Sequence, residues 1–329
     1  PPPPGMRKLV LATSIAETSV TLEDVRIVVD SGLARRPRYD RGAGLTRFVT
    51  ERASRAAVTQ RAGRAARQAP GVALRLWEEA ATAALPAHDP PEILEADLSS
   101  LLLTCLLWGA PDPAALPFLD PPPVPALAEA RELLGTLGAI DDDGRLTEHG
   151  RRIAALPLEP RLAHMLIEAG ERGFPGAAAD VAALLTERGL GGNDPDLEVR
   201  WRRWRNDRSP RAEGARRMAA RWAARVSGHS ASFGARASPD RSDTLAQSIA
   251  LAFPDRLSRR RHASGEHWQS VGGRGFRLDP ASPLARSEWL SVAPASSPPR
   301  GWKKAMSLPC SGTASNSGTR APSIPPAAR

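Results

Sequence analysis

Apolar positions in the first 77 residues fall in short runs separated by polar turns. The runs KLVLA at 8–12 and VRIVVD at 25–30 are rich in aliphatic and β-branched residues, as in buried parallel strands. A third run, VALRLW at 72–77, has the same character. The pattern predicts a partial α/β unit over residues 1–77.

Between these runs, the pattern predicts a hairpin and a helix. In residues 37–50, Gly42 and Gly44 would form the turn, and residues 45, 47 and 49 would alternate with residues 46, 48 and 50 across the second strand, which is typical of two antiparallel strands and a tight turn. Ser54 then precedes a stretch that extends to about Arg67, where Gln68 to Gly71 break it. A serine in this place predicts an N-capped helix.

The apolar spacing becomes helical after residue 77. It predicts helices over 90–110 and 124–140, then a tight turn with a short strand, and a third helix capped by Thr147. This order fits a winged-helix unit over residues 78–150. A generic helical bundle fits the same pattern equally well.

Helical spacing continues through residues 151–228, which we expect to form a second helical domain. Between 200 and 225, arginines outnumber acids and are interleaved with Trp201, Trp204 and Trp222. Such a stretch can be a nucleic-acid face. We favour the alternative, in which the tryptophans turn inward and the arginines coat a solvent face.

The last hundred residues divide into two parts. Residues 229–293 predict a helix followed by short strands around glycine turns, a small α+β domain. Residues 294–329 lose every period and are rich in Pro, Ser and Gly, which predicts a disordered or frameshifted tail. At its other end the chain opens without methionine and almost directly on a strand-like run, so we expect its first domain to be N-terminally truncated.

The composition adds a charge argument. The formal net charge is +9 and the isoelectric point about 10.8, which indicates a polyanionic partner or an arginine bias from a GC-rich coding sequence. Cys105 and Cys310 make no disulfide framework, so a cytoplasmic location is expected. The longest apolar run, 98–108, is too short to span a membrane.

Candidate chemistry lies in two clusters of the α/β unit. If the helix continues to Arg67, then Gln60, Arg64 and Arg67 share one face, and guanidinium groups there can bind phosphate. Gly63 and the neighbouring alanines would let a second domain approach closely. The stretch TSIAETS at 13–19 places hydroxyl groups at the carboxyl edge of the predicted sheet, where α/β proteins bind ligands.

Together the two clusters resemble a known family. ATSIAETSVTLED followed by VVDSG is similar to motif V of DEAH-box helicases, and QRAGRAAR is similar to their motif VI. Downstream, PPEILEADLSSLLL, GRLTEHGRRIAALPLEPRLAHML and LAFPDRLSRRR resemble the bacterial HrpB type of these ATP-dependent helicases. The resemblance covers about residues 7–293.

The resemblance implies roles for individual residues. Gln60, Arg64 and Arg67 would reach the phosphates of ATP across a domain cleft, with Arg64 and Arg67 as catalytic arginine fingers. The residues implied in motif V are Thr13 and Ser14 at the nucleic-acid backbone, Thr21 near the nucleotide and Glu23 at the ribose.

Several features depart from the family pattern. Ala66 stands where motif VI usually has glycine, and Asp24 stands where glycine commonly follows the motif V acid, which we expect to add negative charge near the ribose. The 329 residues contain no GxxxxGK[ST] loop and no Asp-Glu-x-His, so the Mg²⁺ ligands would lie in a missing N-terminal part and the chain should not hydrolyse ATP by itself. His149 and His164 have no neighbouring ligand residues in the sequence, so no metal site is predicted.

We therefore expect a multidomain chain: a partial RecA-like α/β domain, winged-helix and helical ratchet domains that are mostly α, and a small α+β domain. Its cofactor would be ATP with Mg²⁺. Its partners would be the missing N-terminal RecA-like domain and single-stranded nucleic acid, RNA being favoured over DNA. Two alternatives stay open: a non-enzymatic binding module built on a helicase scaffold, and a winged-helix regulator whose α/β part senses a ligand.

Overall fold

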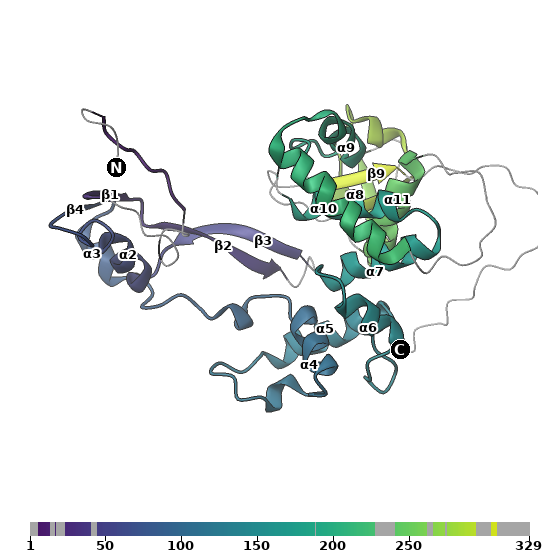
Figure 1. Cartoon of the computed structure of the whole chain (residues 1–329), viewed down its shortest axis with the longest axis horizontal. Coiled ribbons are helices and arrows are strands. Elements are labelled where there is room, and N and C mark those ends of the chain that lie inside the picture. Colours follow the sequence, from purple (N-terminus) through teal and green to yellow (C-terminus); the bar gives the residue numbers. More distant parts are fainter. Residues whose placement is uncertain are drawn as a thin grey trace, which may run out of the picture.

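In the residues that it describes, the structure, a computed structural model, is mostly helical with three sheets (Figure 1). The parts of the chain that it describes are residues 6–13, 17, 24–40, 45–187, 189–227, 241–261, 266–273, 275–293 and 304–307. A search of these residues finds no helix with the length and apolar character that crossing a membrane requires.

A small α/β unit opens the chain. Strand β1 (Ile27–Asp30) pairs in parallel with β4 (Val72–Arg75). Helix α2 (Arg55–Ala62) lies between them in sequence, and a short helix α3 (Glu79–Ala83) follows β4. The predicted strands near 25–30 and 72–77 are therefore confirmed as parallel strands, each four residues long. Their predicted burial is wrong, because the side chains of both strands are largely exposed in this structure.

The predicted strand at 8–12 is wrong. Residues 6–13 form no regular structure, and Leu9 and Leu11 are almost fully exposed. A β-rich run becomes a strand only where a neighbouring backbone offers its hydrogen bonds. In the described part of the chain, β1 and β4 pair only with each other, so residues 6–13 have no ladder to join.

The predicted hairpin is confirmed and is longer than expected. Strands β2 (Leu33–Asp40) and β3 (Leu45–Arg52) are antiparallel, with Asp40 paired to Leu45. The turn with the two predicted glycines lies outside the described residues. The hairpin extends from the α/β unit toward the helical part of the molecule (Figure 1), where the Tyr39 amide donates to the Glu95 carbonyl at 3.0 Å.

After α3, the segment that matches the winged-helix prediction contains three longer α-helices. They are α4 (Ser99–Leu107), α5 (Val124–Thr136) and α6 (Glu148–Ala154). The single helix predicted over 90–110 is wrong, because a 3₁₀ turn, η1 (Glu92–Leu94), is separated from α4 by a turn at Asp97. There, the Asp97 carboxylate accepts the Ser99 amide at 2.7 Å, a local bond that competes with a continuous helix.

The end of this segment follows the sequence closely. Thr147 caps α6 as predicted, its hydroxyl accepting the Gly150 amide at 2.9 Å. Before it, Ile140 and Leu146 form an isolated antiparallel bridge around the predicted turn. Gly150 is required here, since an added Cβ would lie 2.1 Å from the Ala139 carbonyl oxygen.

Four further helices form the largest part of the core. They are α7 (Pro160–Glu171), α8 (Pro175–Thr186), α9 (Leu197–Asn206) and α10 (Pro210–Ser227). Trp204 is fully buried, Trp222 is buried and Trp201 is half-buried. The interpretation that these tryptophans turn inward is confirmed.

The C-terminal part combines one helix with a five-stranded sheet. Helix α11 (Arg241–Ala252) packs on α7 and α8, and its buried residues belong to the same hydrophobic cluster as those of α4 through α10. The sheet has the order β7-β6-β5-β8-β9 and consists of β5 (Leu257–Arg260), β6 (His267–Ser270), β7 (Gly275–Arg277), β8 (Trp289–Ala293) and β9 (Lys304–Ser307).

Strand β9 corrects the prediction of an unstructured tail. Residues 304–307 pair antiparallel with β8 along its edge, so this part of the tail is a strand. A short β-strand without an alternating apolar pattern is not visible from sequence, because the strand that forms its backbone hydrogen bonds lies elsewhere in the chain. Residues 294–303 and 308–329 lie outside the described residues.

Candidate functional site

Helix α2 carries the motif VI cluster, and its start is fixed by its own sequence. The Ser54 hydroxyl accepts the Ala57 amide at 3.1 Å, which satisfies one of the unpaired donors of the first turn. Ala57 and Val58 are buried in a small cluster with Ala34, Ala53 and Leu85. The helix is thereby held against the hairpin, with Gln60 on its exposed side.

The end of α2 differs from the prediction. The helix ends at Ala62, with Gly63 as its C-cap, and the next residues make tighter bonds: the Arg64 amide donates to the Arg61 carbonyl at 3.0 Å. Glycine lowers the stability of a helix interior, which accounts for the stop. Arg64 and Arg67 therefore lie beyond the helix, and the argument that places them with Gln60 on one helical face is wrong.

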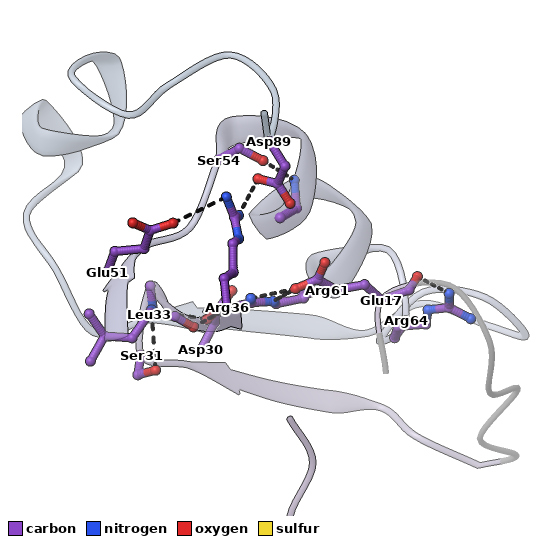
Figure 2. A network of polar contacts seen from close by, with 12 residues as sticks. Glu17, Asp30, Ser31, Leu33, Arg36, Glu51, Ser54, Arg61, Arg64 and Asp89 are labelled. Atoms are coloured by element: carbon purple, nitrogen blue, oxygen red, sulfur yellow. Dashed lines mark hydrogen bonds and ion pairs between the residues drawn. The ribbon is translucent and has the colours of Figure 1, made fainter. Parts of the chain in front are cut away.

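Arg61 is the most highly connected residue of the motif (Figure 2). Its guanidinium donates to the Glu17 carboxylate at 2.5 and 2.8 Å, to Asp30 Oδ1 at 3.1 Å and to the Leu33 carbonyl at 3.0 Å. Burial alone would lower the pKa of Arg61, but the hydrogen bonds and charges of Glu17 and Asp30 raise it overall. This network joins α2 to the end of β1 and to the segment that contains Glu17.

Sequence analysis assigned no role to Arg61 and missed this network. The two acids come from motif V and from the VVD end of β1, up to 44 residues away. Asp30 is 7% exposed, and within the described part of the chain its second oxygen has no hydrogen-bond partner. A buried carboxylate at a strand end is the feature that could have indicated a nearby cation.

Arg64 lies beside the same segment. It is half-buried, and its guanidinium donates to the Glu17 main-chain carbonyl (Figure 2). Arg64 and Thr13 both line a pocket of about 600 Å³, together with Asp30 and Arg61. The structure thus brings together one predicted phosphate ligand and one predicted nucleic-acid contact.

The remaining predicted site residues are placed less closely. Gln60 and Arg67 are exposed, and neither lines this pocket. Ser14, Thr21 and Glu23 lie outside the described residues.

Asp24 has a backbone role that the sequence analysis did not foresee. Its φ is 62°, in the left-handed region, and among the described residues it is the only non-glycine residue with a positive φ. Its amide donates to the Gln68 Oε1 atom at 3.0 Å, which ties the start of β1 to the turn after α2. Glycine adopts this conformation without a Cβ penalty, so the departure from glycine at this position places a strain on the main chain.

The arginine-rich stretch of α9 and α10 presents charge to solvent. Its exposed arginines are Arg202, Arg203, Arg205, Arg208, Arg211, Arg217, Arg221 and Arg225. Some of them pair loosely with acids on the same helix, as Arg217 does with Glu213 at 3.8 Å. Surface pairs of this kind contribute little to stability, so these arginines can bind an anionic partner at small cost.

Arg200 is an exception because it is buried. Only 1% of the residue is exposed, and its guanidinium donates to the Leu184 carbonyl at 3.1 Å and the Leu190 carbonyl at 2.8 Å. Burial lowers the pKa of Arg200. This arginine closes the end of α8 and does not belong to the solvent-facing set.

The two histidines also differ from the sequence expectation. His149 Nε2 and His164 Nδ1 are 2.8 Å apart, and Glu168 lies close to both. Burial lowers the pKa of both imidazoles, that of His164 to about 4. The inference that these residues have no ligand neighbours is therefore wrong, because His149 on α6 meets His164 on α7, where Glu168 lies one helical turn further on.

Comparison with known proteins defines the class of protein to which the chain is related. Residues 130–158 match the family model described as "Helicase associated domain (HA2), winged-helix". This span covers most of α5, the turn after it and α6. The winged-helix interpretation is thus favoured over a generic helical bundle, and the chain is related to helicases.

Individual relatives define the type of helicase. The chain is 42% identical over 294 residues to the ATP-dependent RNA helicase HrpB of Escherichia coli, an alignment that covers 89% of this chain and 34% of that protein. It is 38% identical over 187 residues to a pre-mRNA-splicing factor ATP-dependent RNA helicase of Schizosaccharomyces pombe, which covers 56% of this chain and 16% of the relative.

Solved structures agree with the sequence relatives. Two crystal structures of E. coli HrpB, described as a DExH-box NTPase and a DEAH/RHA helicase, superpose with TM-scores of 0.72 and 0.76 at 38% identity. The superpositions cover 94% and 95% of this chain, and 37% and 38% of the two HrpB chains. The chain is homologous to the C-terminal parts of the DEAH/RHA helicases of the HrpB type, and it spans about a third of the length of HrpB.

Proposed function

We propose that the chain acts as the C-terminal part of an ATP-dependent RNA helicase. In this function it supplies Arg64 and Arg67 as arginine fingers to an ATP molecule held mainly by an N-terminal RecA-like domain, and it forms part of a channel for single-stranded RNA. The proposed domains are residues 1–77, 78–150, 151–228 and 229–293, for the RecA-like, winged-helix, ratchet and C-terminal parts. The proposed location is the cytoplasm.

The observation that carries the proposal is the position of Arg64. This arginine lines a pocket of about 600 Å³ beside the end of β1, and Thr13 lines the same pocket. Ligands of α/β proteins bind at the carboxyl ends of the strands, and β1 ends at Asp30 in this pocket. A guanidinium at the pocket wall fits a phosphate group, because its N–H donors match phosphate oxygens in pairs.

The chemistry assigned to this chain is electrostatic. Phosphoryl transfer develops charge on the phosphate oxygens, and Arg64 and Arg67 would neutralise part of that charge while Gln60 donates a hydrogen bond. Thr21 and Glu23 would contact the nucleotide. Mg²⁺, when bound with ATP, supplies further neutralisation through ligands that the motifs of this chain do not provide.

We further propose that the chain does not hydrolyse ATP by itself. Its 329 residues include no phosphate loop and no Asp-Glu-x-His, which contribute the lysine and the metal-binding acid to phosphoryl transfer. Hydrolysis would require the N-terminal RecA-like domain as a partner.

A chimaera tests the fingers. Residues 7–293 would replace the matching part of E. coli HrpB, and RNA-stimulated ATP hydrolysis would be measured with Arg64→Ala and with Arg55→Ala. Arg55 is exposed at the start of α2, the helix that precedes Arg64, and serves as the matched control. Loss of an arginine finger lowers the rate by about 10³ or more, so equal rates for the two variants would refute the assignment.

Strand binding by the purified chain tests the channel. We expect no ATP hydrolysis, and binding of single-stranded RNA that weakens as salt increases. Arg221→Gln with Arg225→Gln on α10 should reduce the slope of log affinity against log salt by about 1.4 in total, whereas Arg277→Gln on β7 should not change it. Binding with these effects but no ATPase activity in the chimaera would favour the alternative, a non-enzymatic nucleic-acid-binding module.

A further inference from the structure

Three side chains that can bind a metal ion meet where α6 packs on α7. His149 lies on α6, while His164 and Glu168 lie on α7. Their nearest ligand atoms all lie within 4.8 Å of one another, and all three residues are half-buried. The two imidazole rings are nearly perpendicular, at 86°, with their centroids 5.0 Å apart.

The fold fixes the positions of these side chains. His164 and Glu168 are four residues apart on one helix, so they lie on the same face. On α6, the Thr147 cap and the close approach of Gly150 to Ala139 fix the helix start next to His149. The two helices pack against each other, and this packing directs His149 toward α7.

The surrounding charges do not oppose a cation. Three arginines lie near the cluster, and each is paired with a carboxylate. Arg172 donates to Glu168 Oε2 at 2.8 Å, Arg152 donates to Glu171 at 2.6 Å, and Arg161 donates to Asp255 at 3.0 Å. The bond from Arg172 also orients the Glu168 carboxylate, as groups that hold a metal ligand do in known sites.

A hydrogen bond between the two rings is the simpler account of their contact, and it uses only one of the three groups. It requires a proton between His149 Nε2 and His164 Nδ1, and the tautomer decides which ring carries that proton. This hydrogen bond does not explain why the Glu168 carboxylate lies close to both rings. A tetrahedral ion with bonds of about 2.0–2.1 Å would hold two nitrogens about 3.3 Å apart, so the rings need to separate by only about half an ångström from 2.8 Å.

We propose that His149, His164 and Glu168 form a binding site for a divalent transition-metal ion of the zinc class, with water in the fourth position. Two imidazole nitrogens and one carboxylate are ligands that Zn²⁺ prefers, whereas Mg²⁺ and Ca²⁺ prefer oxygen ligands throughout. Binding shifts the proton that lies between the rings to the outer nitrogen of its own ring, so both inner nitrogens present lone pairs and the net proton count is unchanged. The ion would clamp α6 of the winged-helix segment to α7 of the following helices.

Titration with Co²⁺ alone tests the site, because the visible absorption of Co²⁺ reports tetrahedral coordination. We expect one Co²⁺ ion per chain, displacement of Co²⁺ by Zn²⁺, and a higher thermal midpoint in Zn²⁺ than in EDTA. His149→Ala should weaken binding by at least about tenfold. His88→Ala is the matched control, since His88 is exposed and distant in sequence from the cluster, and it should bind as the unchanged chain does.

A second variant keeps the test decisive if His149→Ala does not fold. Glu168→Gln preserves the shape of the side chain and can still accept from Arg172, but it removes the charged ligand, so it should also weaken binding by at least about tenfold. Absence of saturable Co²⁺ binding would overturn the proposal. So would binding that is equal in the unchanged chain and in the Glu168→Gln variant, because other side chains such as Cys310 would then hold the ion.

Discussion

Replacement of Arg61 by alanine should destabilise the α/β unit more than any other single truncation in motif VI. Arg61 is the shared partner of two carboxylates, and the side chains of Glu17 and Asp30 are only 13% and 7% exposed. Removal of one partner from a buried ion pair costs about 3–5 kcal/mol, since the remaining charge stays buried. Because 13% of the Arg61 side chain reaches solvent, we expect a cost of about 3 kcal/mol, or roughly a hundredfold in the opening equilibrium.

Amide hydrogen exchange measures this effect where it occurs. The chain contains several packed units, so a single global free energy of unfolding is poorly defined, whereas exchange reports local opening. Amides of β1 and α2 should exchange up to roughly a hundredfold faster in Arg61→Ala, and amides of α8 should not change. Arg55→Ala removes an exposed arginine from the same helix and should have little effect. Equal protection of β1 in the two variants would refute the reasoning.

Two further predictions concern aspartates. At Asp24, the glycine variant should be more stable than the alanine variant by about 1 kcal/mol because φ is 62°. At Asp142, which has no positive φ, the alanine variant should be at least as stable as the glycine variant. Amide hydrogen exchange of the residues next to each position would show this in the four variants, and the same order at both positions would contradict it. At Asp196, the N-cap of α9, burial raises the carboxyl pKa, so the charged form costs stability above that pKa and the cost disappears as the pH falls below the ordinary value for aspartate. Asp196→Asn keeps a good cap and should therefore increase stability near pH 7, by less than about 1 kcal/mol. The thermal midpoint should rise near pH 7 and not near pH 3. Asp207→Asn should lower stability at neutral pH, because hydrogen bonds from Ser209 lower the pKa of Asp207. A gain in stability for both variants would contradict the opposite pKa shifts of the two aspartates.

Features set by a few neighbouring residues were predictable from sequence. The caps at Ser54 and Thr147, the β2–β3 hairpin and the inward tryptophans of α9 and α10 were all expected. Each depends on local hydrogen bonding or on the periodicity of one element. The motif resemblance added the family, because motif order and spacing carry information that periodicity does not.

Features that depend on a distant partner were not predictable. The run at 8–12 has the composition of a strand but does not form one. Residues 304–307 lack the alternating pattern of a strand but pair with β8. The cluster of His149 with His164 and Glu168 forms because two helices pack. Neither sheet pairing nor helix packing is written in the local pattern, because both depend on where remote segments lie.

One small residue of QRAGRAAR serves the unit that contains it. Sequence alone suggested that Gly63 and the alanines admit a second domain, yet Ala65 is 1% exposed and lies against its own unit, where an added Cβ on Gly71 would come within 2.1 Å of the Ala65 carbonyl. Gly63 and Ala66 are exposed, so the expectation stays a prediction for them. Arg61 points into the same unit and donates to the Glu17 carboxylate, while the Glu17 main-chain carbonyl accepts a hydrogen bond from Arg64. Since Arg61 binds the carboxylate of the residue whose carbonyl accepts from Arg64, the position of Arg64 in the pocket depends on Arg61, which lines the same pocket.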